Sequence, residues 1–194
     1  MRNIVGVLLA AGRGHRFGGN KLMARMDHGD RVGPAAARQL VRVLPESIAV
    51  VRPEDTMLKQ ALRELPIRLV ENPHPEAGMG DSLALAVRAS ADAAGWLIAL
   101  GDMPWVQQET LRQLVARLQC GASLVAPVYQ GRRGHPVGFS AEWGDYLSHL
   151  SGDAGARDLL TVEADRLEQI PSGDPGVLSD VDHRTDLLGP VIRP

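Results

Sequence analysis

Residues 4–21 read Ile-Val-Gly-Val-Leu-Leu-Ala-Ala-Gly-Arg-Gly-His-Arg-Phe-Gly-Gly-Asn-Lys, and no other part of the chain is as informative. The apolar first half predicts a buried strand. The second half carries four glycines, two arginines and a lysine. Glycines let the backbone approach an anion closely, and consecutive N–H groups form an anion-binding concavity. The run therefore predicts a strand that opens into a polyphosphate-binding loop, with an ordinary glycine-rich turn as the alternative.

Two common phosphate-binding motifs do not match this loop. A dinucleotide fingerprint requires G-x-G-x-x-G. Gly12 and Gly14 fit, but Phe17 stands where the third glycine belongs. A P-loop requires Gly-Lys-Ser/Thr after four intervening residues, whereas Gly19, in register with Gly14, is followed by Asn20. The spacing therefore argues against both a Rossmann-type dehydrogenase and a P-loop protein.

The loop resembles the signature of the MobA-like nucleotidyltransferases, which transfer a nucleotide from an NTP onto a phosphate. The matching runs are Leu9-Ala10-Ala11-Gly12, Arg16-Phe17-Gly18 and Lys21. The resemblance extends from residue 4 to about residue 188 and is weakest at residues 24–70. It implies that Arg16 and Lys21 are catalytic and neutralise the triphosphate. It also implies that one run of loop residues binds the nucleotide, namely Leu9, Ala10, Ala11, Gly12 and Gly14.

Length and composition fit one domain spanning residues 1–194. The net charge of −2 and the pI near 6.3 argue against nucleic acid or an anionic membrane surface as a partner. Cys120 is the only cysteine, which excludes an intramolecular disulfide and favours a reducing, cytoplasmic location. We expect no targeting signal and no membrane span, because no apolar run approaches the ~20 residues that a span needs.

Strand-like and helix-like segments alternate along the first two thirds of the chain. Short apolar runs rich in β-branched residues predict strands at residues 4–9, 47–51, 67–70, 96–100 and 123–126. Helical spacing predicts helices at residues 35–44, 57–65, 82–93 and 110–118. The alternation predicts an α/β domain whose mostly parallel sheet is covered by helices on both faces. The resemblance implies the same Rossmann-like nucleotidyltransferase fold.

After Pro127 this alternation breaks down. The sequence predicts short strands at residues 137–139 and 166–170, and helices at residues 141–150 and 154–164. Asp182 can cap a last short helix that ends at Leu188. The motifs that carry chemistry all follow expected strands, where ligands of open α/β sheets gather.

Two acidic positions are candidates for a magnesium site. Asp102 follows the strand at residues 96–100, and Mg²⁺ usually takes one or two carboxylates plus substrate phosphates. Family resemblance implies that Asp102 and Asp182 both hold Mg²⁺ and that Asp102 is catalytic. Asp180 would face the same way as Asp182 in an extended segment. The alternative roles are a turn cap for Asp102 and a helix cap for Asp182.

Two further segments are assigned to the substrates by resemblance. Asn72, Gly78 and Ser82 belong to a segment that closes over the base and ribose, although Asp81 or Ser82 can equally cap a helix. A second set lines the acceptor pocket in the family, and its positions here are Gly134, His135, Asp153 and Arg157. Ordinary loop residues and a capped helix with an exposed arginine are the alternatives for this second set.

The resemblance is strongest to the molybdenum cofactor cytidylyltransferases. It implies transfer of CMP from CTP to the terminal phosphate of the molybdenum–molybdopterin cofactor, with release of pyrophosphate and with Mg²⁺ as the cofactor. Ala11 favours CTP over GTP, because the guanylyl-specific relatives carry glycine at this point. The alternatives are a guanylyl transferase, a sugar- or alditol-phosphate nucleotidyltransferase, or a non-catalytic nucleotide-binding maturation factor for molybdenum hydroxylases.

Overall fold

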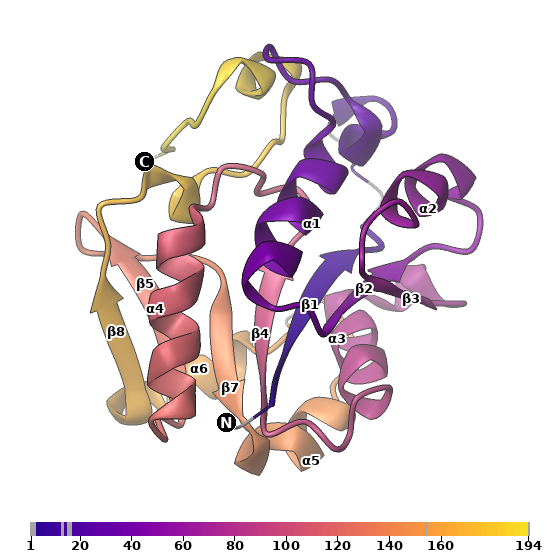
Figure 1. Cartoon of the computed structure of the whole chain (residues 1–194). Helices are drawn as coiled ribbons and strands as arrows, with labels where there is room; N and C mark the ends of the chain where they lie inside the picture. The colour runs from indigo at the N-terminus through magenta and orange to yellow at the C-terminus, as the bar shows by residue number, and fades with distance from the viewer. Residues whose placement is uncertain (1–2, 13, 15–16, 154, 194) are drawn as a thin grey trace.

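One sheet contains all the strands of the described residues. The computed structural model describes residues 3–12, 14, 17–153 and 155–193. The sheet order is β3-β2-β1-β4-β7-β5-β6, and β8 pairs with the other edge of β5 (Figure 1). The strands are β1 (Ile4–Ala10), β2 (Ser47–Val51), β3 (Arg68–Glu71), β4 (Gly95–Leu100), β5 (Leu124–Tyr129), β6 (Arg132–Arg133), β7 (Val137–Ser140) and β8 (Leu167–Pro171).

Most strand pairs are parallel, as the sequence predicts. β1 lies between β2 and β4 and pairs with both in parallel, and β3 and β8 extend the parallel sheet at its two ends. The exceptions are β7, which runs antiparallel between β4 and β5, and the short β6, which pairs antiparallel with β5. A turn at Gln130 and Gly131, both with positive φ, reverses the chain after β5 and sends it back along the sheet.

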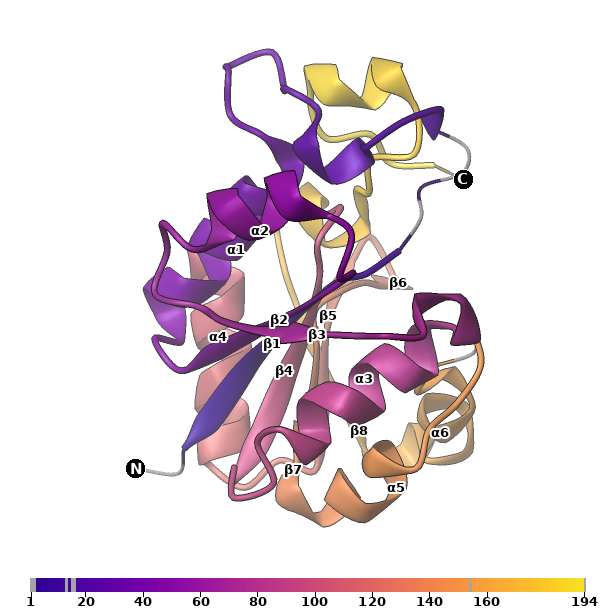
Figure 2. The same ribbon diagram turned by 90° about the vertical axis from the view of Figure 1, so that its right-hand side faces the viewer.

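Helices cover both faces of the sheet, as predicted (Figure 2). The face that carries Leu8 and Ala10 packs against α1 (Val32–Val43), α2 (Thr56–Leu62) and α4 (Gln108–Gln119). The face that carries Val5 and Val7 packs against α3 (Met79–Arg88), α5 (Gly144–Ser148) and α6 (Arg157–Val162). Successive strand residues point to opposite faces of the sheet. Because helices cover both faces, both sets of side chains are buried, and the strands are continuous apolar runs in the sequence.

The helix boundaries differ by several residues from those predicted from the sequence; α1 begins three residues before residue 35, and α2 ends three residues before residue 65. The helix expected at residues 82–93 is α3, which begins three residues earlier and ends at Arg88. Ser90 lies just beyond it and accepts the indole N–H of Trp96 at 2.9 Å. The segment at residues 141–150 divides into a 3₁₀ helix and α5, while residues 154–164 hold α6 and a further 3₁₀ turn, with residue 154 outside the described part. No helix within the described residues has the length and apolar character needed to cross a bilayer.

Candidate active site

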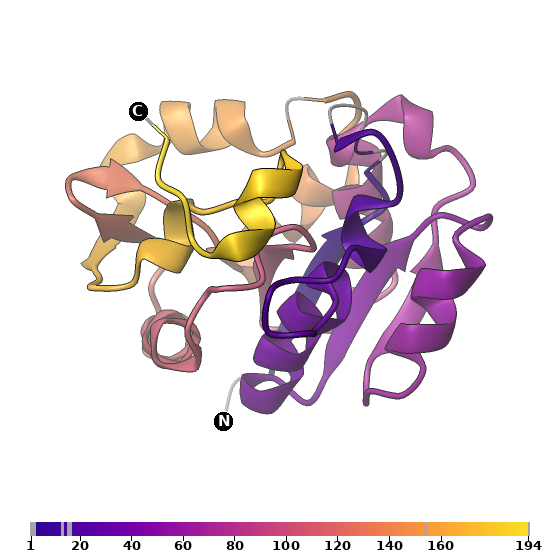
Figure 3. The same cartoon turned by 90° about the horizontal axis from the view of Figure 1, so that it is seen from above.

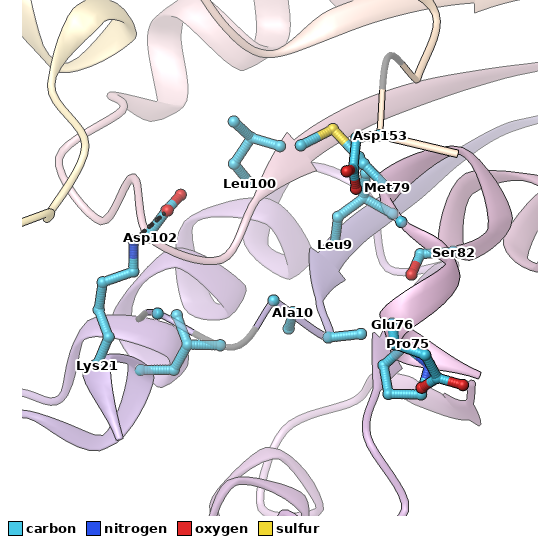
Figure 4. Close-up of a pocket in the computed structure, with 15 residues that line it drawn as sticks. Leu9, Ala10, Lys21, Pro75, Glu76, Met79, Ser82, Leu100, Asp102 and Asp153 are labelled. Atoms are coloured by element: carbon cyan, nitrogen blue, oxygen red, sulfur yellow. Dashed lines mark hydrogen bonds and ion pairs between the residues drawn. The ribbon is translucent and has the colours of Figure 1, made fainter. Parts of the chain in front are cut away.

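A cavity of about 490 Å³ opens beside the carboxyl ends of β1 and β4. Figure 4 shows Lys21 and Asp102 at one end, Ser82, Met79 and Asp153 at the other, and Ala10 between them. The lining residues are Leu9, Ala10, Ala11, Gly12, Gly14, Lys21, Leu22, Pro75, Glu76, Gly78, Met79, Ser82, Leu100, Asp102 and Asp153. The cavity therefore lies at the sheet edge where the sequence places a ligand.

Most of the residues predicted to bind the nucleotide line this cavity. The run from Leu9 to Gly12 leaves β1 along the cavity wall, and Gly14, Gly78 and Ser82 also contribute. Arg16 lies outside the described residues.

Asn72 differs from the other predicted nucleotide-binding residues, because its buried side chain lies behind the cavity wall. Its amide donates to the Ser82 hydroxyl at 3.0 Å, and its carbonyl oxygen accepts the His74 N–H at 2.9 Å. Asn72 thus orients Ser82, which lies on the cavity wall.

Lys21 brings the two predicted metal-binding carboxylates together. Its Nζ lies 2.7 Å from Oδ2 of Asp102 and 3.2 Å from Oδ1 of Asp182. Burial lowers the pKa of Lys21, but the charges and hydrogen bonds of Asp102 and Asp182 outweigh burial and hold that pKa above its usual value. The ammonium is therefore charged, and it occupies a position between two anionic oxygens where a cation is stabilised.

A third carboxylate completes an acidic cluster. One oxygen each from Asp102, Asp180 and Asp182 lie within 4.8 Å of one another. The backbone joins the two contributing segments, because Val181 N–H donates to the Asp102 carbonyl at 2.9 Å. Burial, followed by repulsion from Asp182 and Asp102, raises the pKa of Asp180. Such a cluster of oxygen donors suits a hard divalent cation.

The alternative role of Asp182 as a helix cap is wrong. The last helix is the 3₁₀ helix η7 (Arg184–Leu188), and its N-cap is His183. The Asp186 carboxylate accepts the backbone N–H groups of Asp182 at 2.9 Å and His183 at 2.6 Å. The Asp182 side chain is thereby left to face Lys21.

Only one of the residues predicted to bind the acceptor lines the cavity. Asp153 lines the cavity, whereas Gly134, His135 and Arg157 do not. Gly134 packs against the turn at Val177, where an added Cβ would lie 2.3 Å from the carbonyl oxygen. Arg157 is exposed at the start of α6. The cavity lined by Asp153 therefore gives no support for an acceptor role of the other three residues.

His135 holds a buried ring nitrogen, Nδ1, without a hydrogen-bond partner. Burial, then the charge of Arg133, lowers the pKa of His135 to about 4, against an opposing effect of Asp102. The folded state therefore favours neutral His135. The stability that this residue contributes is complete above its ordinary pKa of 6.5 and is lost as the pH falls toward 4.

We predict that the His135→Gln variant loses less stability than the wild type between pH 6.5 and pH 4. Glutamine keeps a polar side chain but does not titrate, so only the part of the pH dependence that belongs to His135 disappears. Chemical denaturation of both proteins across this pH range measures the difference. Parallel stability curves for the two proteins would contradict the prediction.

Two segments far apart in sequence meet at the Ser82 end of the cavity. Gly80 N–H donates to the Gly152 carbonyl at 2.7 Å, and Gly152 N–H donates to Asp81 at 3.0 Å. Neither Asp81 nor Ser82 is the N-cap of α3, which is Gly78. The predicted capping alternative for these two residues is therefore wrong. Asp81, in the first turn of α3, instead binds the segment that carries Asp153.

We predict that the Gly80→Ala variant is destabilised by about 1–3 kcal/mol, because overpacking has costs of this order. The added Cβ would lie 2.8 Å from the Ser151 carbonyl oxygen and 2.9 Å from that of Gly152, so one segment must move. Thermal and urea unfolding measure the effect. Gly173→Ala is the matched control, since nothing lies within 4 Å of its Cβ, and it should change stability by less than about 0.5 kcal/mol.

Some cavity residues were not predicted from the sequence. Leu22, Pro75, Glu76, Met79 and Leu100 all line the cavity. Met79, the first residue of α3, is 45% exposed and lines the cavity. Pro75 and Glu76 belong to a short 3₁₀ turn, which has no sequence periodicity by which it could be recognised.

Comparison with known proteins identifies the family of this chain. A model of the MobA-like NTP transferase domain matches residues 6–170. The chain is 31% identical over 188 residues to nicotine blue oxidoreductase of Paenarthrobacter nicotinovorans, with 92% of each chain covered. It is 30% identical over 190 residues to the purine catabolism protein PucB of Bacillus subtilis, with 92% of this chain and 91% of PucB covered.

Solved structures share the fold. Mth528, a nucleotidyl transferase from Methanothermobacter, superimposes with a TM-score of 0.81 at 23% identity, over 96% of this chain and 94% of Mth528. The complex of Mycobacterium tuberculosis Rv0371c with manganese gives a TM-score of 0.71 at 25% identity, with 88% of each chain covered. These neighbours confirm the predicted α/β nucleotidyltransferase fold. The chain therefore belongs to the MobA-like NTP transferase domain family.

Proposed function

We propose that this protein transfers CMP from CTP to the terminal phosphate of a molybdenum–molybdopterin cofactor and releases pyrophosphate. The proposal rests on one observation above all. At one end of a cavity of about 490 Å³, the Lys21 ammonium lies within hydrogen-bond distance of both Asp102 and Asp182. Residues 1–194 would act as a single domain in this reaction, and its setting would be the cytoplasm.

The two ends of the cavity suit the two parts of a nucleoside triphosphate. The Lys21 end carries the Lys21 ammonium beside the Asp102 carboxylate, and the glycine-rich backbone that follows β1 leads toward it. We assign the phosphates to this end and assign Arg16 to the same task. The other end combines the exposed thioether of Met79 with the Ser82 hydroxyl, which suits a base and ribose (Figure 4).

In the proposed reaction an oxygen of the acceptor phosphate attacks the α-phosphorus of CTP, and the bond between that phosphorus and the β-phosphate oxygen breaks. The acceptor oxygen is already anionic, so no general base is needed. The protein must align two anions that repel each other and stabilise the charge that moves onto pyrophosphate. Lys21 supplies positive charge at this point, and the loop backbone supplies N–H donors.

The acidic cluster fits a divalent cation. Asp102 and Asp182 would hold it, with Asp180 beside them, and carboxylate oxygens are the ligands that Mg²⁺ prefers. A bound Mg²⁺ would neutralise charge on the phosphate oxygens during transfer. The related Rv0371c forms a complex with manganese, which supports a divalent metal requirement for this protein.

Ala11 supports CTP as the nucleotide. Its side chain is buried in the core that faces α3, yet the residue also lines the cavity wall. A methyl group at this point narrows the space beside the loop relative to the glycine of guanylyl-specific relatives. We therefore propose CTP ahead of GTP.

The remaining assignments concern the acceptor and a partner. Asp153 lines the cavity at the end away from Lys21, and we assign it to the acceptor side together with Gly134, His135 and Arg157. A molybdenum hydroxylase, or its maturation factor, would receive the product.

The decisive experiment supplies the purified protein with each of the four NTPs, Mg²⁺ and molybdopterin-bound molybdenum. Pyrophosphate release and mass spectrometry of the product are the readouts. The proposal predicts CTP consumption that depends on the acceptor, and a cytidine dinucleotide product. Preference for GTP, or turnover only with sugar or alditol phosphates, would overturn the substrate assignment.

Two further outcomes would overturn the proposal of catalysis by nucleotidyl transfer. Nucleotide binding without turnover would indicate a maturation factor that does not catalyse the reaction. Because one relative is named an oxidoreductase, oxidation of NADH or NADPH is assayed in parallel with nucleotide transfer. Turnover of NADH or NADPH without pyrophosphate release would show that this chain carries out redox chemistry instead.

A further inference from the structure

The last described residues bind the segment that carries two of the clustered carboxylates. Arg193 Nη1 lies 2.9 Å from Oδ1 of Asp180, and its Nη2 pairs with Oδ2 of Asp186. The side chain of Arg132, on β6, donates to the carbonyl oxygen of Arg193. Arg193 therefore bridges two carboxylates six residues apart, while its own backbone is anchored to β6.

Asp186 transmits this contact to Asp182. The Asp186 side chain is only 4% exposed, and its carboxylate accepts the backbone N–H groups of Asp182 and His183. Burial raises the pKa of Asp186, but these N–H groups and Arg193 outweigh burial and keep that pKa below its usual value. The buried carboxylate is thus ionised, and it holds the backbone of Asp182 in place.

A second set of contacts joins the same turn to the N-terminal part of the chain. Asp27 N–H donates to the Leu187 carbonyl at 3.1 Å, and the Arg184 guanidinium lies 5.4 Å from the centre of the Phe17 ring. Figure 3 shows the C-terminal segment beside the N-terminal loop. The turn at residues 180–188 therefore connects the acidic cluster with the chain on either side of Lys21.

We propose that Arg193 is a positioning residue for the metal site. Its guanidinium bridges Asp180 and Asp186 and so orients the backbone that presents Asp182 to the cation. Arg193 does not line the cavity and is assigned no contact with the substrate. This inference rests on the proposed function, because it assumes that the acidic cluster binds a divalent metal ion.

The sign of the effect on metal binding separates positioning from simple electrostatics. Arg193 carries a positive charge beside the cluster, and its removal alone would strengthen the attraction for a divalent cation. Loss of positioning weakens metal binding, because removing a residue that orients the metal ligands typically lowers metal affinity 10–100-fold. If Arg193 orients Asp182, its removal weakens metal binding although a repulsive charge has gone.

The experiment measures Mn²⁺ binding to the full chain without nucleotide, by calorimetry and by the electron paramagnetic resonance signal of free Mn²⁺. We expect Arg193→Ala to weaken binding about tenfold. Arg193→Lys keeps the charge but lacks the planar fork that spans two carboxylates, so it should also weaken binding. It serves as the second variant if Arg193→Ala does not fold.

Arg166→Ala is the matched control. Arg166 also pairs with a carboxylate, that of Glu142, and its side chain is 44% exposed compared with 35% for Arg193. It does not line the cavity, and its loss should leave Mn²⁺ affinity unchanged. Unchanged or tighter binding by both Arg193 variants would overturn the positioning role. Failure of the wild type to bind Mn²⁺ would instead count against the metal site of the proposed function.

Discussion

Replacing Asp102 with asparagine should lower the rate of nucleotide transfer by roughly a thousandfold. A metal ion at the reacting phosphate is worth several kcal/mol, and each 1.36 kcal/mol is a factor of ten in rate. Asparagine preserves the shape of the side chain but removes the charge that faces Lys21 at 2.7 Å and the other two carboxylates. Steady-state pyrophosphate release with CTP and Mg²⁺ measures the loss.

A thermal-shift measurement tests the same assignment without catalysis. Mn²⁺ that binds only the folded protein raises its melting temperature, and this rise should disappear in the Asp102→Asn variant. Asp145→Asn is the control, because the Asp145 side chain is 96% exposed on α5 and should leave both the rate and the shift unchanged. Normal turnover of CTP by Asp102→Asn would show that the metal assignment is wrong.

Replacing Lys21 with methionine should lower kcat by about 100–1000-fold, with a smaller effect on KM. Preorganised donors aimed at developing charge have effects of this size. The Lys21 ammonium contacts both Asp102 and Asp182, so methionine removes positive charge from the point where the triphosphate is expected. The same variant should bind Mn²⁺ more tightly without nucleotide, because a competing positive charge has gone.

Lys59→Met is a closely matched control for this second prediction. The chain has only two lysines, and both side chains are 12% exposed and paired with a carboxylate, Lys59 with Glu71 at 2.8 Å. Lys59 lies on α2 and does not line the cavity, so its loss should leave kcat unchanged. Equal losses of activity in the two variants would mean that Lys21 acts through stability and not through the transition state.

The elements of the first half of the fold were predictable because their signals are local. β1, β2 and β4 are buried on both faces, so they are continuous apolar runs, and α4 shows apolar residues at helical spacing. The place of β7 was not predictable. Residues 137–139 were predicted as a strand, but the antiparallel insertion between β4 and β5 follows from a turn at Gln130 and from contacts with two distant strands.

The residues of the candidate site were likewise only partly predictable from the sequence. The loop after β1 and Asp102 after β4 were predictable, because a short motif directly follows a recognisable strand. Asn72 was assigned to the nucleotide, yet its side chain holds Ser82 from behind. Sequence spacing does not report the direction of a side chain, and it gave no indication that Asp81 binds the loop at Gly152.

By itself, the order of residues determined the family, the α/β class and the residue types at the edge of the sheet. These properties follow from hydrophobic periodicity and from short motifs, which depend on near neighbours in the chain. Only the tertiary structure brought Lys21 to Asp182, which is 161 residues away, and attached Arg193 to the same turn. The physical reason is that ion pairs and buried hydrogen bonds depend on distances in space, which are set only when the sheet and its helices pack together.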